Sequence, residues 1–138
     1  MRTTTILVVD DYASWRSMLR SKLEGKSGFQ VIAEAGNGCE AIEKAARLHP
    51  DVVLLDIGMP LLNGIEAAPR IRRVSPDSKI IFITQEQDNE IRTAALATGA
   101  EGYLLKSNAA AELTSAIHAA LDSTQPVLPA LSPSLVFG

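Results

Sequence analysis

Acidic residues directly follow two short apolar runs of the sequence. Asp10 and Asp11 come after residues 6–9, and Asp56 comes after residues 52–55. If the two runs form neighbouring parallel strands, their ends place three carboxylates in one small pocket. The mutual repulsion of such carboxylates is tolerable only when a cation or a proton joins them. The sequence therefore predicts a pocket suited to a hard metal ion and a phosphoryl group.

Other polar residues belong to the later apolar runs. Thr84 follows residues 79–83, Lys106 follows residues 102–105, and Tyr103 lies inside that last run. Open parallel sheets bind their ligands at the carboxyl ends of the strands, beside the point where the strand order reverses. This one topological rule places the three acids, Thr84 and Lys106 at the same edge of the sheet. Their co-occurrence is therefore a more specific signal than any one of them.

The elements that must position these side chains alternate along the chain. Short runs rich in β-branched residues alternate with longer helical patterns, which is typical of βα units wound around a parallel sheet. Five units can be counted, and the predicted strands are residues 5–9, 30–35, 52–55, 79–83 and 102–105. The third and fourth runs are almost purely apolar, as expected for strands that are covered on both faces.

Apolar residues at helical spacing predict which faces of the helices are buried. The predicted stripes are Trp15, Leu19 and Leu23 in the first helix, Ala41, Ala45 and Leu48 in the second, and Leu113, Ile117 and Leu121 in the fifth. Trp15 needs no ligand to explain its place in such a stripe.

Capping residues and prolines predict how several helices begin and end. The third helix is expected to start near Asn63, and Pro69 inside it should kink the helix or shift its register. The fourth helix should end at Gly99, a natural left-handed cap. Ser107 or Asn108, both good N-caps, should begin the fifth helix.

Size and composition limit the class of protein. A chain of 138 residues and 14.7 kDa is predicted to form one domain with a single core. Its single cysteine, Cys39, cannot form a disulfide within the chain, which fits a reducing compartment. Neither a signal-peptide core nor an apolar run of about 20 residues is present. We therefore expect a cytoplasmic protein without membrane contact.

Charge distribution and the C-terminal composition exclude some further roles. The net charge is −3, and the basic residues are scattered except for Arg70, Arg72 and Arg73, which are interpreted as a solvated helix face. A duplex-binding surface would concentrate positive charge, so direct contact with nucleic acid is not expected. Periodicity ends after residue 122. The predicted organisation is a folded domain over residues 1–122 and a flexible Pro-rich linker or tail over residues 123–138.

At its polar strand ends the chain resembles the receiver domain of bacterial two-component response regulators. That family combines an acidic pair, a phosphorylated aspartate, a serine or threonine, and a lysine. The matching segments are Val9-Asp10-Asp11, Leu55-Asp56-Ile57-Gly58-Met59-Pro60, Asn63-Gly64, Ile83-Thr84 and Gly102-Tyr103-Leu104-Leu105-Lys106. The resemblance covers residues 5–122, and residues 100–107 look most like the NarL-like branch. The predicted fold is α/β, a flavodoxin-like doubly wound five-stranded parallel sheet in strand order 2-1-3-4-5, with helices on both faces.

The resemblance implies a phosphorylation site at Asp56. This residue would take a phosphoryl group from the phosphohistidine of a sensor histidine kinase, or from a small acyl phosphate, and form an aspartyl phosphate. Lys106 would hold the phosphoryl oxygens and Thr84 would donate its hydroxyl to one of them, completing the catalytic set. The chain would catalyse only its own phosphorylation and slow dephosphorylation. It is therefore interpreted as a regulator and not as an enzyme.

The resemblance also implies Mg²⁺ as a cofactor. Asp11 would ligate the ion directly and Asp10 would support it, partly through water. Asp56 and the carbonyl of Gly58 would supply further oxygen ligands. Magnesium suits such a site because it retains several of its waters.

A conformational switch is a further implication of the resemblance. When Thr84 moves toward the phosphate, Tyr103 is expected to turn inward and fill the vacated space. The face formed by the fourth helix, fifth strand and fifth helix would then change shape and offer a surface for a homodimer mate. Phosphate would shift a pre-existing two-state equilibrium. One departure is Gln85, which stands where the family usually has alanine or glycine; its long side chain is expected to slow phosphoryl exchange.

Several readings of the whole chain remain open. In the NarL-like branch a DNA-binding domain follows a linker, so the favoured function is a receiver that controls a transcriptional output domain absent from this chain. The alternatives are a stand-alone single-domain regulator and a phosphorylation-independent interaction module. Asp10 and Asp11 could also simply cap the first helix. A haloacid-dehalogenase-type phosphatase needs a DxD motif, whereas the two acids here are adjacent.

Overall fold

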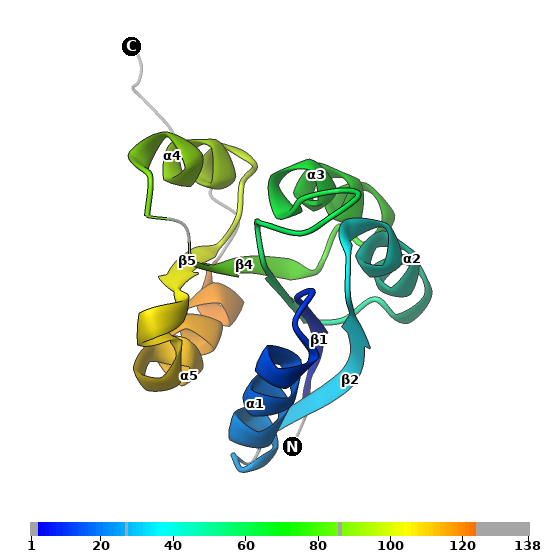
Figure 1. Cartoon of the computed structure of the whole chain (residues 1–138). Helices are drawn as coiled ribbons and strands as arrows, with labels where there is room; N and C mark the ends of the chain where they lie inside the picture. Colours follow the sequence, from blue (N-terminus) through cyan, green and yellow to red (C-terminus); the bar gives the residue numbers. More distant parts are fainter. Residues whose placement is uncertain (1–2, 27, 86, 124–138) are drawn as a thin grey trace.

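A computed structural model describes residues 3–26, 28–85 and 87–123. Within them, five strands alternate with five helices (Figure 1). The elements are β1 (Thr4–Val9), α1 (Ala13–Glu24), β2 (Phe29–Ala35), α2 (Gly38–Leu48), β3 (Val52–Leu55), α3 (Gly64–Val74), β4 (Lys79–Thr84), α4 (Asn89–Ala97), β5 (Gly102–Leu105) and α5 (Lys106–Asp122). The predicted strands are confirmed to within one residue at each end. Apart from Ser123, the predicted tail lies outside the described residues.

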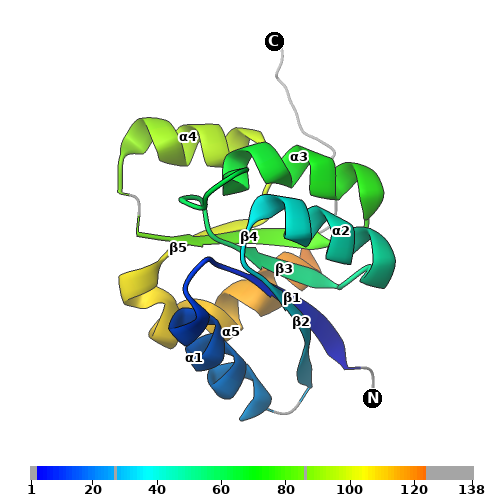
Figure 2. The ribbon, with the colours of Figure 1, turned by 45° about the vertical axis from the view of Figure 1, so that its right-hand side comes forward.

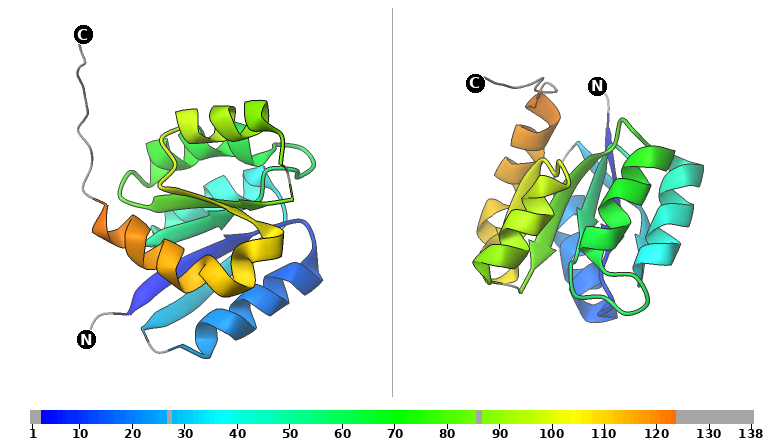
Figure 3. Two further views of the ribbon diagram at one scale, coloured as in Figure 1. Left: turned by 90° about the vertical axis from the view of Figure 1, so that its left-hand side faces the viewer. Right: turned by 90° about the horizontal axis from the view of Figure 1, so that it is seen from above.

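All five strands form one parallel sheet in the order β2-β1-β3-β4-β5. The predicted fold class and strand order are therefore confirmed. Figures 2 and 3 show α2, α3 and α4 on one face of the sheet and α1 and α5 on the other. The chain leaves β1 toward β2 on one side and later returns to pair β3 on the other side. The strand order thus reverses between β1 and β3, where a parallel sheet opens a crevice at its carboxyl edge.

Alternation along the central strands builds two separate apolar layers. In β1, Ile6 and Val8 pack with α1 and α5, whereas Leu7 and Val9 pack with the helices of the opposite face. Successive side chains of a strand point to opposite faces, so a strand covered by helices on both sides must be apolar throughout. All four residues of β3 are buried. The two layers hold the central strands, and hence their polar ends, in fixed register.

The predicted helix stripes are confirmed at six of their nine residues, whereas Trp15 and Leu121 are half-buried and Leu48 is exposed. The buried faces contain Leu19 and Leu23 in α1, Ala41 and Ala45 in α2, and Leu113 and Ile117 in α5. The prediction for Leu48 is wrong, because its side chain is 38% exposed. Leu48 is the last residue of α2, and His49 (φ 46°) turns the backbone out of the helix directly after it. No following helical turn covers the Leu48 side chain.

The start of α5 differs from the prediction. Leu105 is the N-cap, without a capping side chain, and Lys106 is the first helical residue. Ser107 and Asn108, the predicted caps, are exposed residues of the first turn. The difference arises because β5 passes into α5 without a loop. At the end of α4 the prediction holds, since Gly99 has a φ of +90°.

Helix α3 begins with a reciprocal cap. The Asn63 side chain accepts a hydrogen bond from the Glu66 backbone N–H (2.9 Å), and the Asn63 N–H donates to the Glu66 carboxylate (3.1 Å). Pro69 is exposed, and the helix continues past it to Val74. A kink or register shift at Pro69 stays a prediction.

The prediction that Arg70, Arg72 and Arg73 form a solvated helix face is only partly confirmed. Arg72 is half-buried; its guanidinium lies 3.1 Å from a Glu101 carboxylate oxygen and donates to the Thr98 carbonyl at 3.2 Å. Arg70 and Arg73 are exposed. The prediction fails at Arg72 because helical spacing cannot reveal a partner that the fold brings in from the connection between α4 and β5.

Candidate functional site

The three predicted acids meet where β1 and β3 end. The Asp56 N–H donates to the Val9 carbonyl and the Asp10 N–H to the Ala35 carbonyl, both at 3.0 Å, so strand pairing continues one residue beyond the sheet. Carboxylate oxygens of Asp10, Asp11 and Asp56 lie within 4.8 Å of one another. Asp10 and Asp56 are 1% and 6% exposed, whereas Asp11 faces solvent. The predicted acidic pocket is confirmed.

Lys106 balances part of this negative charge. Its Nζ lies 2.6 Å from Asp10 Oδ2 and 3.7 Å from Asp56 Oδ2, and its side chain is 10% exposed. The other Asp10 oxygen accepts the Tyr12 backbone N–H at 2.9 Å. A buried ion pair of this kind is kept only when its members are closely paired, because both charges have been taken out of water.

Burial is the main reason why the pKa of Asp56 is raised to about 6. The neighbouring Asp10 carboxylate raises it further, the Lys106 ammonium opposes the shift, and Asp11 adds a smaller increase. Near neutral pH the Asp56 carboxylate is therefore ionised but poorly stabilised. Any added cation lowers the cost of that charge.

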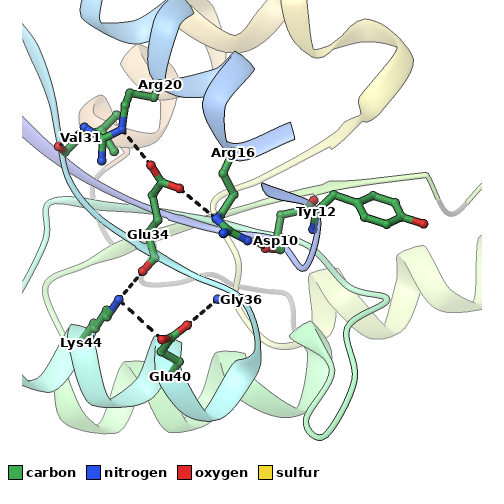
Figure 4. Close-up of polar contacts among 9 residues, drawn as sticks. All are labelled: Asp10, Tyr12, Arg16, Arg20, Val31, Glu34, Gly36, Glu40 and Lys44. Atoms are coloured by element: carbon green, nitrogen blue, oxygen red, sulfur yellow. Dashed lines mark hydrogen bonds and ion pairs between the residues drawn. The ribbon is translucent and has the colours of Figure 1, made fainter. Parts of the chain in front are cut away.

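A set of ion pairs between α1 and β2 fixes the backbone of the acidic pair (Figure 4). Arg16 Nη1 donates to the Asp10 carbonyl at 2.6 Å, and Arg16 Nε donates to Glu34 at 2.9 Å. Arg20 Nε donates to the second Glu34 oxygen at 2.8 Å. The hydrogen bond from Arg20, reinforced by Arg16, lowers the pKa of Glu34, although burial opposes the shift. Helical and strand periodicity do not predict this contact, because residues 16 and 34 belong to different elements.

A pocket of about 160 Å³ opens over these carboxylates. It is lined by Asp11, Tyr12, Asp56, Gly58, Thr84, Gln85 and Lys106. The structure thus brings six of the seven predicted site residues together, counting Asp10 through its contact with Lys106. Tyr103 is the exception. It is half-buried against the core cluster between the sheet and α2 to α4, with the Arg92 guanidinium carbon 5.6 Å from its ring centroid.

The start of α3 packs directly on the backbone that leaves Asp56. The Gly64 N–H donates to the Ile57 carbonyl at 2.9 Å. A Cβ atom at position 64 would lie 2.2 Å from the Asp56 carbonyl oxygen. Only glycine fits this contact, so the sequence Asn63-Gly64 is more than a turn signal: it sets how closely α3 approaches the pocket.

The chemistry of the donor set suits a small hard cation. Asp10, Asp11 and Asp56 offer three carboxylate oxygens within ligand distance of one site. Mg²⁺ is commonly bound by one or two carboxylates while it keeps several waters, and Asp11 is open to solvent. The residues present therefore fit such an ion.

Comparison with known proteins agrees with this geometry. A family model described as "Response regulator receiver domain" matches residues 6–118. The chain belongs to that family. Members of the receiver family are signalling regulators and not classical enzymes. The predicted family is confirmed.

Named relatives of this receiver include regulators of the NarL-like branch. This receiver is 35% identical to the response regulator GacA of Pseudomonas viridiflava over 130 residues. It is also 35% identical to the nitrate/nitrite response regulator NarL of Escherichia coli K12 over 131 residues. These alignments cover 94% and 95% of the receiver but 61% of each relative. The chain therefore spans about three fifths of their length.

The fold has close counterparts among solved structures. The response regulator domain of Thermotoga maritima CheB matches this receiver with a TM-score of 0.83 and 33% identity, covering 90% of this chain and all (100%) of that domain. Across the described part of the receiver, no helix has the length and apolar character needed to cross a membrane.

Proposed function

We propose that this receiver is a phosphorylation switch in which Asp56 accepts a phosphoryl group from a sensor histidine kinase. The observation that supports the proposal is the placement of the Lys106 ammonium 3.7 Å from the Asp56 carboxylate, inside a cluster of two further acids. A carboxylate is a weak nucleophile, so positioning and charge neutralisation must supply most of the catalysis. This pocket contains groups for both.

The transfer exchanges one bond of phosphorus for another. An Asp56 carboxylate oxygen attacks the phosphorus and forms a P–O bond as the P–N bond to the donor imidazole breaks. The imidazole leaves with the bonding electron pair and takes up a proton. Lys106 neutralises the transferred oxygens, and the Thr84 hydroxyl donates to one of them.

A bound Mg²⁺ would be held by Asp11, Asp56 and the Gly58 carbonyl, with Asp10 acting partly through water. The ion would supply positive charge next to the transferring group. Asp10 also keeps Lys106 in the pocket through their 2.6 Å ion pair. The same residues therefore serve both the cation and the lysine.

The output of the switch is assigned to the face formed by α4, β5 and α5. Thr84 lies at the end of β4 and Tyr103 lies on β5, so movement of the first toward phosphate would let the second turn inward. In a cytoplasmic two-component pathway this face would bind a second copy. The NarL-like relatives are longer than this chain. We therefore favour a longer protein in which this receiver controls a transcriptional output domain, and the alternative is a stand-alone regulator.

Phosphorylation of purified protein tests the proposal. With Mg²⁺ and labelled acetyl phosphate, we expect one acid-stable, base-labile phosphoryl group per chain, and none in Asp56→Asn. The matched control is Asp77→Asn, which alters an exposed acid in the connection between α3 and β4 and should leave labelling unchanged. Undiminished labelling of Asp56→Asn, or an unlabelled wild-type protein, would contradict the proposal.

A further inference from the structure

The Lys106 ammonium lies against aromatic rings as well as carboxylates. Its Nζ is 5.0 Å from the centroid of the Trp15 ring and 5.8 Å from the centroid of the Tyr12 ring. Both distances fall within the range of about 6 Å in which a cation is attracted to an aromatic face, and tryptophan gives the strongest attraction. Trp15 comes from α1 and Lys106 from α5, the two helices that share one face of the sheet (Figure 3).

The environment of Trp15 does not match a role in core packing alone. Leu19 and Leu23, which continue the same stripe of α1, are buried to 2% and 1% exposure, whereas Trp15 is only half-buried. Its indole Nε1 is nevertheless buried and has no hydrogen-bond partner among the described residues. An unpaired buried N–H is costly, and an aliphatic residue would fill the stripe without that cost. Core packing alone therefore does not explain a tryptophan at this position of the stripe.

Contact with an aromatic face suits the task that Lys106 must perform. The ammonium has three N–H donors, and ring contacts attract its charge without requiring a hydrogen-bond acceptor. The donors then remain available for oxygen atoms. When a phosphoryl group arrives at Asp56, the ammonium can redirect donors from the carboxylates to the new oxygens while the ring continues to hold it near the site. Exclusion of water by the ring also strengthens the attraction between ammonium and phosphoryl group.

We infer that Trp15 is a positioning residue for phosphoryl transfer, acting by holding the Lys106 ammonium beside Asp56. The inference rests on the proposed function of Asp56 as the acceptor. With acetyl phosphate as donor, a P–O bond to Asp56 forms, the P–O bond to acetate breaks, and acetate leaves with the electron pair. Trp15 takes no part in these bonds; it sets where the neutralising charge lies.

A series of substitutions at position 15 tests the inference. The rate constant for labelling by acetyl phosphate should follow the strength of the cation–π contact, with Trp15 fastest, Trp15→Tyr and Trp15→Phe intermediate, and Trp15→Leu slowest. The loss in Trp15→Leu should be about twofold to thirtyfold, the range that such a contact can supply. Met18→Leu is the matched control, since Met18 is also a half-buried residue of α1 packed on the same core cluster. Its rate constant should equal that of the wild type.

Two further measurements separate positioning from general damage to the fold. The Mg²⁺ affinity, measured by calorimetry, should not be lower in Trp15→Leu than in the wild type, because the carboxylates are unchanged and a less firmly held ammonium competes less with the ion. In NMR spectra, the Lys106 side-chain protons should be shifted upfield by the Trp15 ring, and Trp15→Leu should remove that shift.

The outcomes distinguish this inference from the proposed function. A Trp15→Leu protein that is labelled as fast as the wild type, or a wild type without the upfield shift, overturns the role of Trp15 alone. Parallel loss of Mg²⁺ affinity in Trp15→Leu also overturns it, since the effect would then be on the whole pocket. A wild type that takes up no phosphate refutes Asp56 as acceptor, and the inference with it.

Discussion

Asp56 is a buried carboxyl group whose ionisation destabilises the folded protein. Burial and the neighbouring Asp10 raise the pKa of Asp56 from 3.8 to about 6. The folded state therefore holds the proton more tightly than the unfolded state, and stability falls as the pH rises through this interval. Below the unfolded pKa both states are protonated and the penalty vanishes.

Asp56→Asn should accordingly stabilise the protein at pH 8 in the absence of divalent cations. A shift of this size corresponds to a gain in the free energy of unfolding on the order of 2–3 kcal/mol. The gain should shrink as the pH falls from 6 and be absent near pH 3.5. Urea denaturation of both proteins across this range, with EDTA present, measures it. Asp77→Asn is the control with no expected gain, and equal stability of Asp56→Asn and wild type at pH 8 would contradict the assigned penalty.

Gln85 lies at the opening of the pocket, at a position where the family usually has alanine or glycine. It is exposed and lines the pocket together with Asp56 and Lys106. We expect its long side chain to restrict the approach of a donor or of water, so Gln85→Ala should speed both acetyl-phosphate uptake and dephosphorylation severalfold. Gln87→Ala is a suitable control, because Gln87 lines neighbouring hollows and not the acid pocket. Unchanged rates in Gln85→Ala would remove this role.

At the scale of elements, the junction between β3 and α3 controls the position of Asp56. Gly64→Ala would place a Cβ atom 2.2 Å from the Asp56 carbonyl oxygen. Because the atoms it would meet belong to the backbone, relieving this clash requires a costly shift of β3 or α3. We expect a loss of about 1–3 kcal/mol in the free energy of unfolding, together with slower phosphorylation. Chemical denaturation and acetyl-phosphate labelling measure the two effects.

Gly36→Ala provides the comparison for that prediction. A Cβ atom at position 36 would meet its nearest neighbour, Arg16 Nη1, at 3.7 Å, which is ordinary contact. Equal stabilities of Gly64→Ala and Gly36→Ala would show that α3 can move away from β3 without cost.

The elements also show what the sequence could and could not predict. Strand ends were predictable because a parallel sheet places all its carboxyl ends at one edge, so Asp56 and Lys106 could be matched without knowing any contact. The start of α5 was mispredicted, since good capping residues at 107 and 108 do not cap when a strand runs directly into the helix. Arg72 and Trp15 were interpreted from helical spacing alone, which says nothing of partners supplied by distant segments.

At the scale of the whole molecule, we expect the acidic pocket to make stability depend on divalent cations. Ions that bind the folded state alone stabilise it by mass action, by about 2.7 kcal/mol when their concentration is 100 times the dissociation constant. Mg²⁺ should therefore raise the Tm of the wild type measured by calorimetry. Asp11→Asn should lose most of the increase, because it removes the most exposed carboxylate of the cluster. An equal increase from NaCl at matched ionic strength would point to general screening instead.

Leu105 ends β5 and Lys106 begins α5, so no linking residue separates the lysine from the helix that follows. A displacement of the lysine backbone is thereby also a displacement of the first helical turn. A molecule that binds α5 more tightly in one orientation of the helix must therefore change the affinity of the pocket for a phosphoryl group. Because such coupling is reciprocal, the phosphoryl group must change the affinity for that molecule by the same factor. With a single glycine inserted at this junction, both ligands should still bind, but binding of one should no longer change the affinity for the other.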